Sequence, residues 1–378
     1  MKFDFHYCCI KALAQRAGFS AKDAQLIAYA SQYTDDAVEN EPLHVTGLPD
    51  VAGLRLKKGL LDPICTAHKV LLSNWKEIRR TWTLRKDATK LDSQKKVYVP
   101  FHFLPPQAKV AGKDFDFVVK PNGELANMLV KTAVDYLNQT TKADRDRGLI
   151  KLGLAVHTFA DNWSHQGFSG RYSEKENDLK NPDSIEPKFD WKDMVASLAS
   201  VTVPEVGHSQ AGDLPDLGYV SKWTYKYKYK KANGFSPRNN GAIYLDAAEK
   251  IYTIFNQVTV RKSEAAPWDD IRDDISACLT HQYSVWDDRD EKKRAILAPW
   301  KQTFDGITFS YNPHFWRTKA LKLVGSGNHD FESWEKEDYE KTKFAFNQDS
   351  NNGNNMYFLY FHAEAKLHRQ FSLDNVPL

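Results

Sequence analysis

Apolar positions recur at helical spacing through much of the first 170 residues, which indicates amphipathic helices packed on a shared core. Gly18 can end the first of them in a left-handed conformation. Ser20 begins the next, where Asp23 three residues later resembles a capping box, and its small apolar face runs to Asp35. The pattern predicts helices at residues 6–17, 20–35, 123–137 and 144–165.

The stretch VYVPFHF around residue 100 is predicted to be extended, because Pro100 and the pair Pro105 and Pro106 disfavour helix on both sides. His102 lies inside it. Residues 171–262 are rich in Pro, Asn, Asp and Lys and carry the turn clusters KNPDS and SPRNNG, so loops are expected there. Helices are predicted to return at residues 242–256, 268–283 and 356–371.

The segment WTYKYKYKK at residues 223–231 alternates aromatic and basic side chains, which is strand periodicity with one aromatic and one basic face. Three interpretations remain open. The segment suits an anionic membrane interface, or stacking on single-stranded bases beside phosphates. It also suits a lysine-protected edge hairpin whose aromatic face packs on the protein.

Composition narrows the class of protein. A hydrophobic content of 42% with 27% charged residues is ordinary for a globular chain and excludes disorder over its whole length. With 52 basic and 49 acidic side chains the molecule has no global field for a polyanion, so binding a nucleic acid needs a local patch. The sequence shows neither a membrane-spanning apolar run nor a signal peptide, so we expect a cytoplasmic protein, or one exported by a signal-independent route. Four cysteines without a CxxC pair are expected to stay reduced.

The stretch HTFADNWSHQGF holds His157, Asp161 and His165 at intervals of four residues. On a helix these side chains project along one face, which the neighbouring apolar residues hold toward the interior. A buried carboxylate between two imidazoles needs compensation for its charge, and a divalent cation such as zinc supplies it. The alternative is a hydrogen-bonded polar cluster or a solvated face.

Other candidate ligands lie where predicted elements end, which is where scaffolds commonly present functional side chains. Their imidazole and carboxylate groups are numerous enough for a multinuclear site. We expect Asn162, Ser164 or Gln166 to orient the ligating imidazoles. The candidates are His6, Asp35, Asp36, His102, His208, Asp213 and Asp216.

These blocks together resemble the zinc-dependent phospholipase C and P1/S1 nuclease superfamily, and most closely a bacterial branch of it. The resemblance covers about the first 220 residues and is carried by FDFHY, SQYTDDA, PFHFLP, HTFADNWSHQGFSG and VGHSQAGDLPD. It implies a mainly α protein, a phospholipase C/P1 nuclease-like helical bundle with loop and β-hairpin insertions in the middle. On this basis residues 1–378 are predicted to form a single catalytic domain, with a loop-rich insertion region at 171–265 and a C-terminal helical part at 266–378.

The resemblance also implies a ligand set for two or three Zn²⁺ ions, or other divalent metals. By position, His157 and Asp161 would join Asp35 and His102 around one metal, and His6 and Asp161 would serve a second. His165, His208 and Asp213 would hold a third. The chain departs from the secreted members, in which the mature N-terminal residue binds zinc, and this leaves Asp4 or Met1 for that place.

The expected activity is hydrolysis of a phosphodiester by metal-activated water, with Asp35 as ligand and Asp35 or Asp36 orienting that water. The spacing of the motif favours a phospholipase C-like enzyme that cleaves a phospholipid headgroup ester, and such an enzyme is expected to make peripheral contact with a membrane surface. A P1/S1-like nuclease is the first alternative, and nucleic acid is the less favoured substrate. A metal-stabilised interaction module without catalysis is the second, and the sequence does not identify a protein partner.

Overall fold

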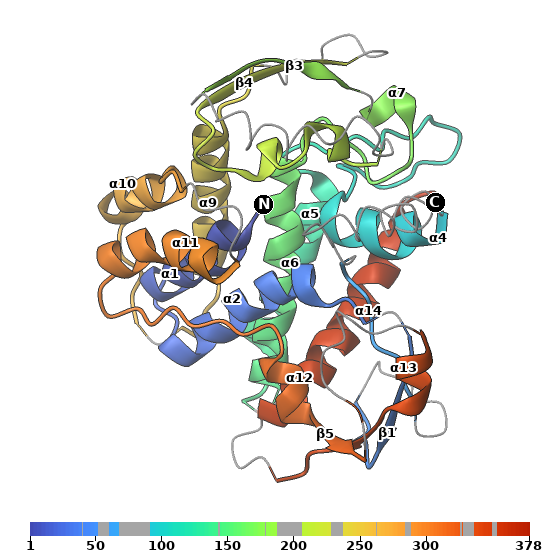
Figure 1. The fold of residues 1–378 in the computed structure, drawn as a ribbon. Helices are drawn as coiled ribbons and strands as arrows, with labels where there is room; N and C mark the ends of the chain where they lie inside the picture. Colours follow the sequence, from blue (N-terminus) through green and yellow to red (C-terminus); the bar gives the residue numbers. More distant parts are fainter. Residues whose placement is uncertain are drawn as a thin grey trace.

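The computed structural model describes most of the chain and shows a mainly α protein (Figure 1). The described residues are 1–39, 41–51, 60–67, 91–142, 144–177, 179–186, 206–227, 237–261, 263–283, 289–325, 327, 336–349 and 354–378. Outside the described residues lie most of the stretch from Leu54 to Arg80, which includes His68, and also His329. The segment of alternating Lys and aromatic residues at 222–231, called the Lys and aromatic ribbon below, is described only as far as Tyr227.

Four of the predicted helices are confirmed with small shifts at their ends. The N-terminal helix starts with a π-helical turn, η1, and continues as α1 until Gly18, whose φ is 92°. Ser20 caps α2 as predicted, because its hydroxyl accepts the backbone N–H of Asp23. The bounds are η1 Asp4–Cys9, α1 Ile10–Arg16, α2 Ala21–Asp36, α5 Glu124–Gln139 and α6 Arg145–Ser164.

The C-terminal part is also mostly helical, and α14 returns from it to the N-terminal helices (Figure 1). The longer helices are α9 Asn240–Asn256, α10 Trp268–Leu279, α11 Arg289–Thr303 and α14 Tyr357–Asn375. The shorter elements are α4 Leu91–Ser93, η2 Gln94–His102, α7 Glu174–Asn177, η4 Ser209–Ala211, η5 Leu214–Asp216, α12 Phe315–Ala320, α13 Lys336–Lys341 and η6 Asn354–Met356. No helix in the described ranges combines the length and hydrophobicity that a bilayer span requires.

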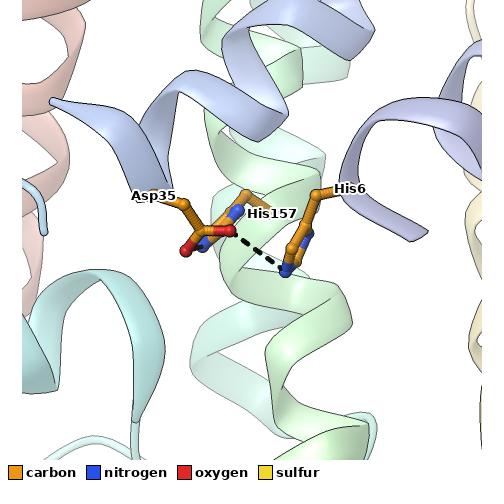
Figure 2. Close-up of side chains that lie close together, drawn as sticks. All are labelled: His6, Asp35 and His157. Carbon is orange, nitrogen blue, oxygen red and sulfur yellow. Dashed lines mark ion pairs between the residues drawn. The ribbon is translucent and has the colours of Figure 1, made fainter. Parts of the chain in front are cut away.

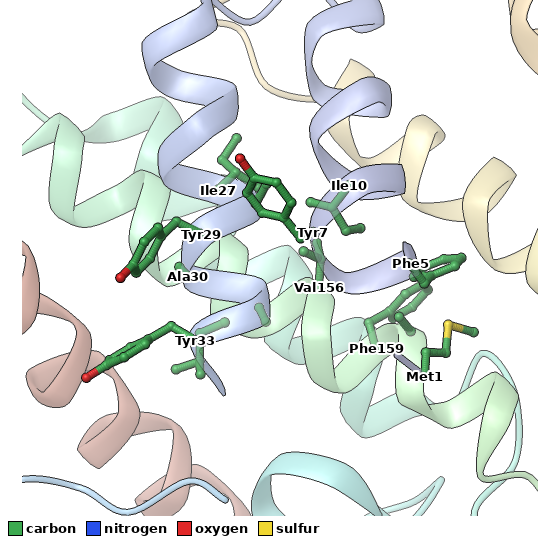
Figure 3. Packing of buried hydrophobic residues seen from close by; sticks show 14 of the residues in the cluster. Met1, Phe5, Tyr7, Ile10, Ile27, Tyr29, Ala30, Tyr33, Val156 and Phe159 are labelled. Atoms are coloured by element: carbon green, nitrogen blue, oxygen red, sulfur yellow. The ribbon is translucent and has the colours of Figure 1, made fainter. Parts of the chain in front are cut away.

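Helix α6 lies at the centre, and α2, α5, α9 and α14 pack around it (Figure 1). Its side chains are buried almost all round, as expected for a central helix. The packing with α2 is close: a Cβ added to Gly153 would overlap the carbonyl oxygen of Ile27 and lie 2.7 Å from the Cβ of Ala30. Figure 3 shows the apolar side chains of α2 and α6, including Ile27 and Val156, that close this interface.

Gly153→Ala is therefore expected to destabilise the protein by about 1–3 kcal/mol, because the methyl group meets backbone that cannot move without separating α2 from α6. Gly148→Ala is the matched control on the same helix, where the added Cβ would meet the flexible side chains of Leu137 and Tyr136. That change should cost less than about 1 kcal/mol, since alanine is the better helix former. Urea unfolding of both variants measures the difference, and equal losses would contradict the close packing.

Two small sheets accompany the helices. The first has the order β2-β1-β6-β5, with β1 parallel to β6 and the other neighbours antiparallel. The second pairs β3 with β4 in antiparallel fashion. The strands are β1 Leu43–Thr46, β2 Leu60–Leu61, β3 Leu179–Glu186, β4 Lys222–Tyr227, β5 Leu321–Val324 and β6 Lys343–Phe346.

Two expectations about local structure were wrong. The segment around residue 100 is helical rather than extended, and Pro100 lies inside η2. In a π-type turn each bond spans five residues, as from Phe103 N to Tyr98 O at 2.9 Å, and the wider turn tolerates a missing N–H. The cluster KNPDS is part of β3 rather than a loop, with a register shift between Lys180 and Ser184 where proline interrupts the pairing.

The described part of the Lys and aromatic ribbon faces inward with its rings. Trp223 is fully buried and Tyr225 is 3% exposed, whereas Lys222 lies at the surface. The strand periodicity is confirmed for β4, and so is the packed aromatic face for these two rings. Neither ring is therefore available as a stacking platform for a base or as a membrane anchor.

Candidate metal centre

Three elements of the N-terminal half converge with α6 on one buried cluster. His6 comes from η1, Asp35 from the last turn of α2 and His102 from the last residue of η2, while His157 and Asp161 lie one turn apart on α6. Figure 2 shows His6, Asp35 and His157 pointing toward one another from three separate segments. The residues predicted from sequence as ligands for two metals are thus brought together.

Asp161 is the centre of this cluster. Its Oδ1 lies 3.0 Å from Nε2 of His6, and its Oδ2 lies 3.1 Å from Nδ1 of His102 and 3.4 Å from Nε2 of His157. Burial alone would raise the pKa of Asp161, but the nearby amino terminus and imidazoles hold it well below the usual range. The carboxylate is therefore ionised and 1% exposed.

Asp35 lies on the solvent side of the cluster. Its carboxylate oxygens lie 3.7 Å from Nε2 of His157, 3.8 Å from Nδ1 of His102 and 4.0 Å from Nε2 of His6. These separations exceed hydrogen-bond length and leave room for a cation between the groups. The Asp35 side chain is 30% exposed while His6 and His157 are fully buried, so the cluster opens to solvent at Asp35.

A second grouping lies at the C-terminal end of α6. Nε2 of His165 lies 3.4 Å from Oδ1 of Asp216, and Nε2 of His208 lies 3.3 Å from Oδ2 of the same residue. The structure corrects one predicted ligand here, because Asp213 points elsewhere and its Oδ1 accepts the Nζ of Lys2 at 2.7 Å. Asp216 occupies the position that was expected for Asp213.

Backbone carbonyls fix the tautomers of three imidazoles. Nε2 of His102 donates to the carbonyl oxygen of Thr66 at 2.8 Å, Nδ1 of His165 to that of His102 at 2.6 Å, and Nδ1 of His208 to that of Gly212 at 2.9 Å. A carbonyl oxygen only accepts, so each of these nitrogens carries the proton. In the neutral form of each ring, the other nitrogen would turn a lone pair toward Asp161 or Asp216.

Lone pairs that face carboxylates repel one another unless a cation or a proton lies between them. Burial disfavours a second proton on His6 and on His165: desolvation lowers the pKa of His6 to about 4 and also lowers the pKa of His165. His102 differs, because its hydrogen bond to Asp161 outweighs burial and raises its pKa. In addition, Nδ1 of His6 and Nδ1 of His157 are buried without a hydrogen-bond partner among the described residues.

The donor atoms form three groups whose ligand atoms lie within 4.8 Å of one another in each group. Imidazole and carboxylate are the donors that zinc and related divalent metals take, and the arrangement of lone pairs against carboxylates fits such cations. The groups are His6 with Asp35 and His157, His102 with His157 and Asp161, and His165 with His208 and Asp216.

The remaining candidates have other partners. Asp36, predicted as an alternative base, accepts the hydroxyl of Tyr311 at 2.5 Å and the amide of Gln32 at 3.2 Å, and belongs to none of the three groups. Asp4 accepts the backbone N–H of Phe5, and burial raises its pKa to about 6. The amine of Met1, rather than Asp4, contacts Asp161 at 2.7 Å.

The polar neighbours expected to orient the imidazoles do not contact them. Gln166 donates to the carbonyl of Trp163, and Ser164 accepts from the amine of Met1. Both amide atoms of Asn162 are buried without a hydrogen bond in the described part of the chain. The carbonyl of Thr66 is far from the motif in sequence, and no local pattern marks it, so sequence reasoning missed it.

Comparison with known proteins adds one family. A protein-family model described as a family of unknown function, DUF6765, matches residues 1–376. No curated protein and no solved structure gives a significant match to the chain. Because the family model spans almost the whole sequence and every residue of the three groups, the chain belongs to the DUF6765 family.

Proposed function

We propose that this chain is a metal-dependent phosphodiester hydrolase with a helical fold of the phospholipase C/P1 nuclease type. The observation that supports it best is the pairing of three imidazoles with fixed tautomers, those of His102, His165 and His208, with Asp161 and Asp216 in two of the three groups. Structural zinc sites are usually closed and often contain Cys, whereas this cluster has no Cys and opens to solvent at Asp35. That combination favours catalysis over a purely stabilising role.

Two or three divalent cations held by these groups would supply a water of lowered pKa and positive charge for the phosphoryl oxygens. The protein itself contributes orientation. Carbonyls of Thr66, His102 and Gly212 fix the rings, and burial keeps His6 neutral and able to donate its lone pair. Of the two carboxylates near His157, Asp161 is buried and Asp35 reaches solvent. Asp35 is therefore the side chain that could orient the attacking water.

The substrate class follows from the resemblance in sequence: a phospholipid headgroup ester is the first candidate. The buried rings of Trp223 and Tyr225 support neither stacking on single-stranded bases nor a membrane anchor, so the preference for lipid rests on the resemblance alone. A nuclease remains the alternative that the assay must separate.

Elemental analysis of the purified protein tests the proposal. We expect about two or three divalent metals per chain, a lower content in His157→Ala, and wild-type content in His44→Ala, whose side chain lies exposed on β1. The metal-loaded protein should release phosphocholine from phosphatidylcholine vesicles more readily than nucleotides from single-stranded DNA.

The outcomes separate the hypotheses. If the protein is purified without chelator and still contains no metal, the proposal is rejected. Metals without hydrolysis of either substrate would indicate a metal-stabilised module, and faster nucleotide release would indicate a nuclease.

A further inference from the structure

Arg238, from the sequence SPRNNG, pairs with Trp223 of β4 next to the C-terminal end of α6, which carries His165 into the group with His208 and Asp216. Arg238 is 2% exposed. Its Nη2 donates to the carbonyl oxygen of Ser164 at 2.8 Å and lies 3.4 Å from that of Trp163. These carbonyls belong to the last turn of α6, directly before His165, where a helix leaves its acceptors unsatisfied and favours a positive charge.

Arg238 is itself held by β4. Its backbone N–H donates to the carbonyl of Trp223 at 2.8 Å, and its carbonyl accepts from Trp223 at 2.9 Å. The guanidinium carbon also lies 5.2 Å from the centroid of the Trp223 ring. Because this tryptophan is fully buried, the guanidinium has a fixed position relative to the end of α6.

Asn240 continues the network to the other ligand of the group. Its Oδ1 accepts the indole N–H of Trp223 at 3.1 Å, and its Nδ2 donates to the carbonyls of Leu214 at 2.6 Å and Leu217 at 2.9 Å. These two carbonyls bracket Asp216. Asn240 is fully buried. Through these hydrogen bonds its amide links the loop around Asp216 to Trp223 of β4, the residue that pairs with Arg238.

We propose that Arg238 and Asn240 are positioning residues that set the distance between His165 and Asp216, and so the affinity of this third group for a divalent cation. The inference rests on the proposed function. One side of the group is fixed by Arg238 at the end of α6, and the other by Asn240 at the loop. The other two groups take their ligands from η1, α2, η2 and the preceding turns of α6. Loss of either positioning residue should therefore weaken one metal and spare two.

Stepwise chelator competition with Zn²⁺ on the purified protein tests the assignment. Arg238→Met should raise the dissociation constant of one metal by about 10- to 100-fold and leave the other two unchanged. Arg238→Lys, which restores a donor and a positive charge, should recover part of that loss. Asn240→Asp keeps the acceptor for Trp223 but loses the donor to Leu214 and Leu217, so it should act like Arg238→Met.

Asn239→Ala is the matched control in the same cluster. Asn239 caps α9 by accepting the N–H of Ala242, so its loss should lower the melting temperature without changing any metal dissociation constant. The inference is overturned if Arg238→Met weakens all metals alike, or none, or if the wild type binds only two. A wild type without metal would overturn the proposed function instead. If Arg238→Met does not fold, the lysine and Asn240→Asp variants decide in the same way.

Discussion

Asp161→Asn is expected to remove more than one metal from each chain and to lower phosphodiester hydrolysis by about 100-fold or more. Loss of a neighbour that only orients a ligand costs about 10- to 100-fold, and Asp161 is proposed as a ligand itself. Asp161 belongs to the group with His102 and His157, and its other oxygen contacts His6 of the neighbouring group, so one substitution affects both.

The change keeps the size of the side chain but removes its charge. The new amide also turns N–H donors, which cannot bind a cation, toward part of the cluster. Elemental analysis, with hydrolysis measured at saturating metal, gives the result. Asp213→Asn is the matched control: its carboxylate pairs with Lys2 and is 41% exposed, so we expect full metal content. Metal loss in Asp213→Asn, with none in Asp161→Asn, would show that Asp161 was assigned the wrong role.

Arg317→Met is expected to lower the free energy of unfolding by about 3–5 kcal/mol, because it leaves the charge of Glu39 buried. Nη1 of Arg317 donates to Oε1 of Glu39 at 2.6 Å, and the two side chains are 3% and 0% exposed. The pair joins the end of α2 to α12, where Trp316 also stacks on Tyr29 with ring centroids 4.0 Å apart.

Urea unfolding in the presence of chelator isolates this effect from metal binding. Adding Glu39→Gln to Arg317→Met should recover part of the loss, since the uncompensated charge is then gone. Lys341→Met, which breaks an exposed pair with Glu337, should leave stability unchanged within the precision of the measurement. A double variant no more stable than Arg317→Met would contradict the explanation by buried charge.

Local signals were sufficient for the long helices and for much of the candidate site. Helical periodicity and the Ser20 cap located α2, and the spacing of His157 and Asp161 placed both on one face of α6. These features depend on residues within a few turns of one another, so the sequence displays them directly.

What remained hidden depends on contacts between distant segments or on fine turn geometry. Asp213 and Asp216 are three residues apart in a loop, and the positive φ of Gly212 together with the short η5 decides which of them meets His208. In the same way, Pro100 sits in a π-type turn that packs against α14, and this tertiary contact overrides the local preference for extended backbone.

The parallel pairing of β1 with β6 ties residues 44–46 to residues 343–345, and α14 covers α6 beside the cluster. A piece of the protein trimmed to the motif-bearing first 220 residues would lose both. Helix α6 would lose the packing of α14 on one side, and β1 would lose its pairing with β6. The proposed metal cluster therefore depends on the last third of the chain for its packing, and variants made to study the cluster should include residues 221–378.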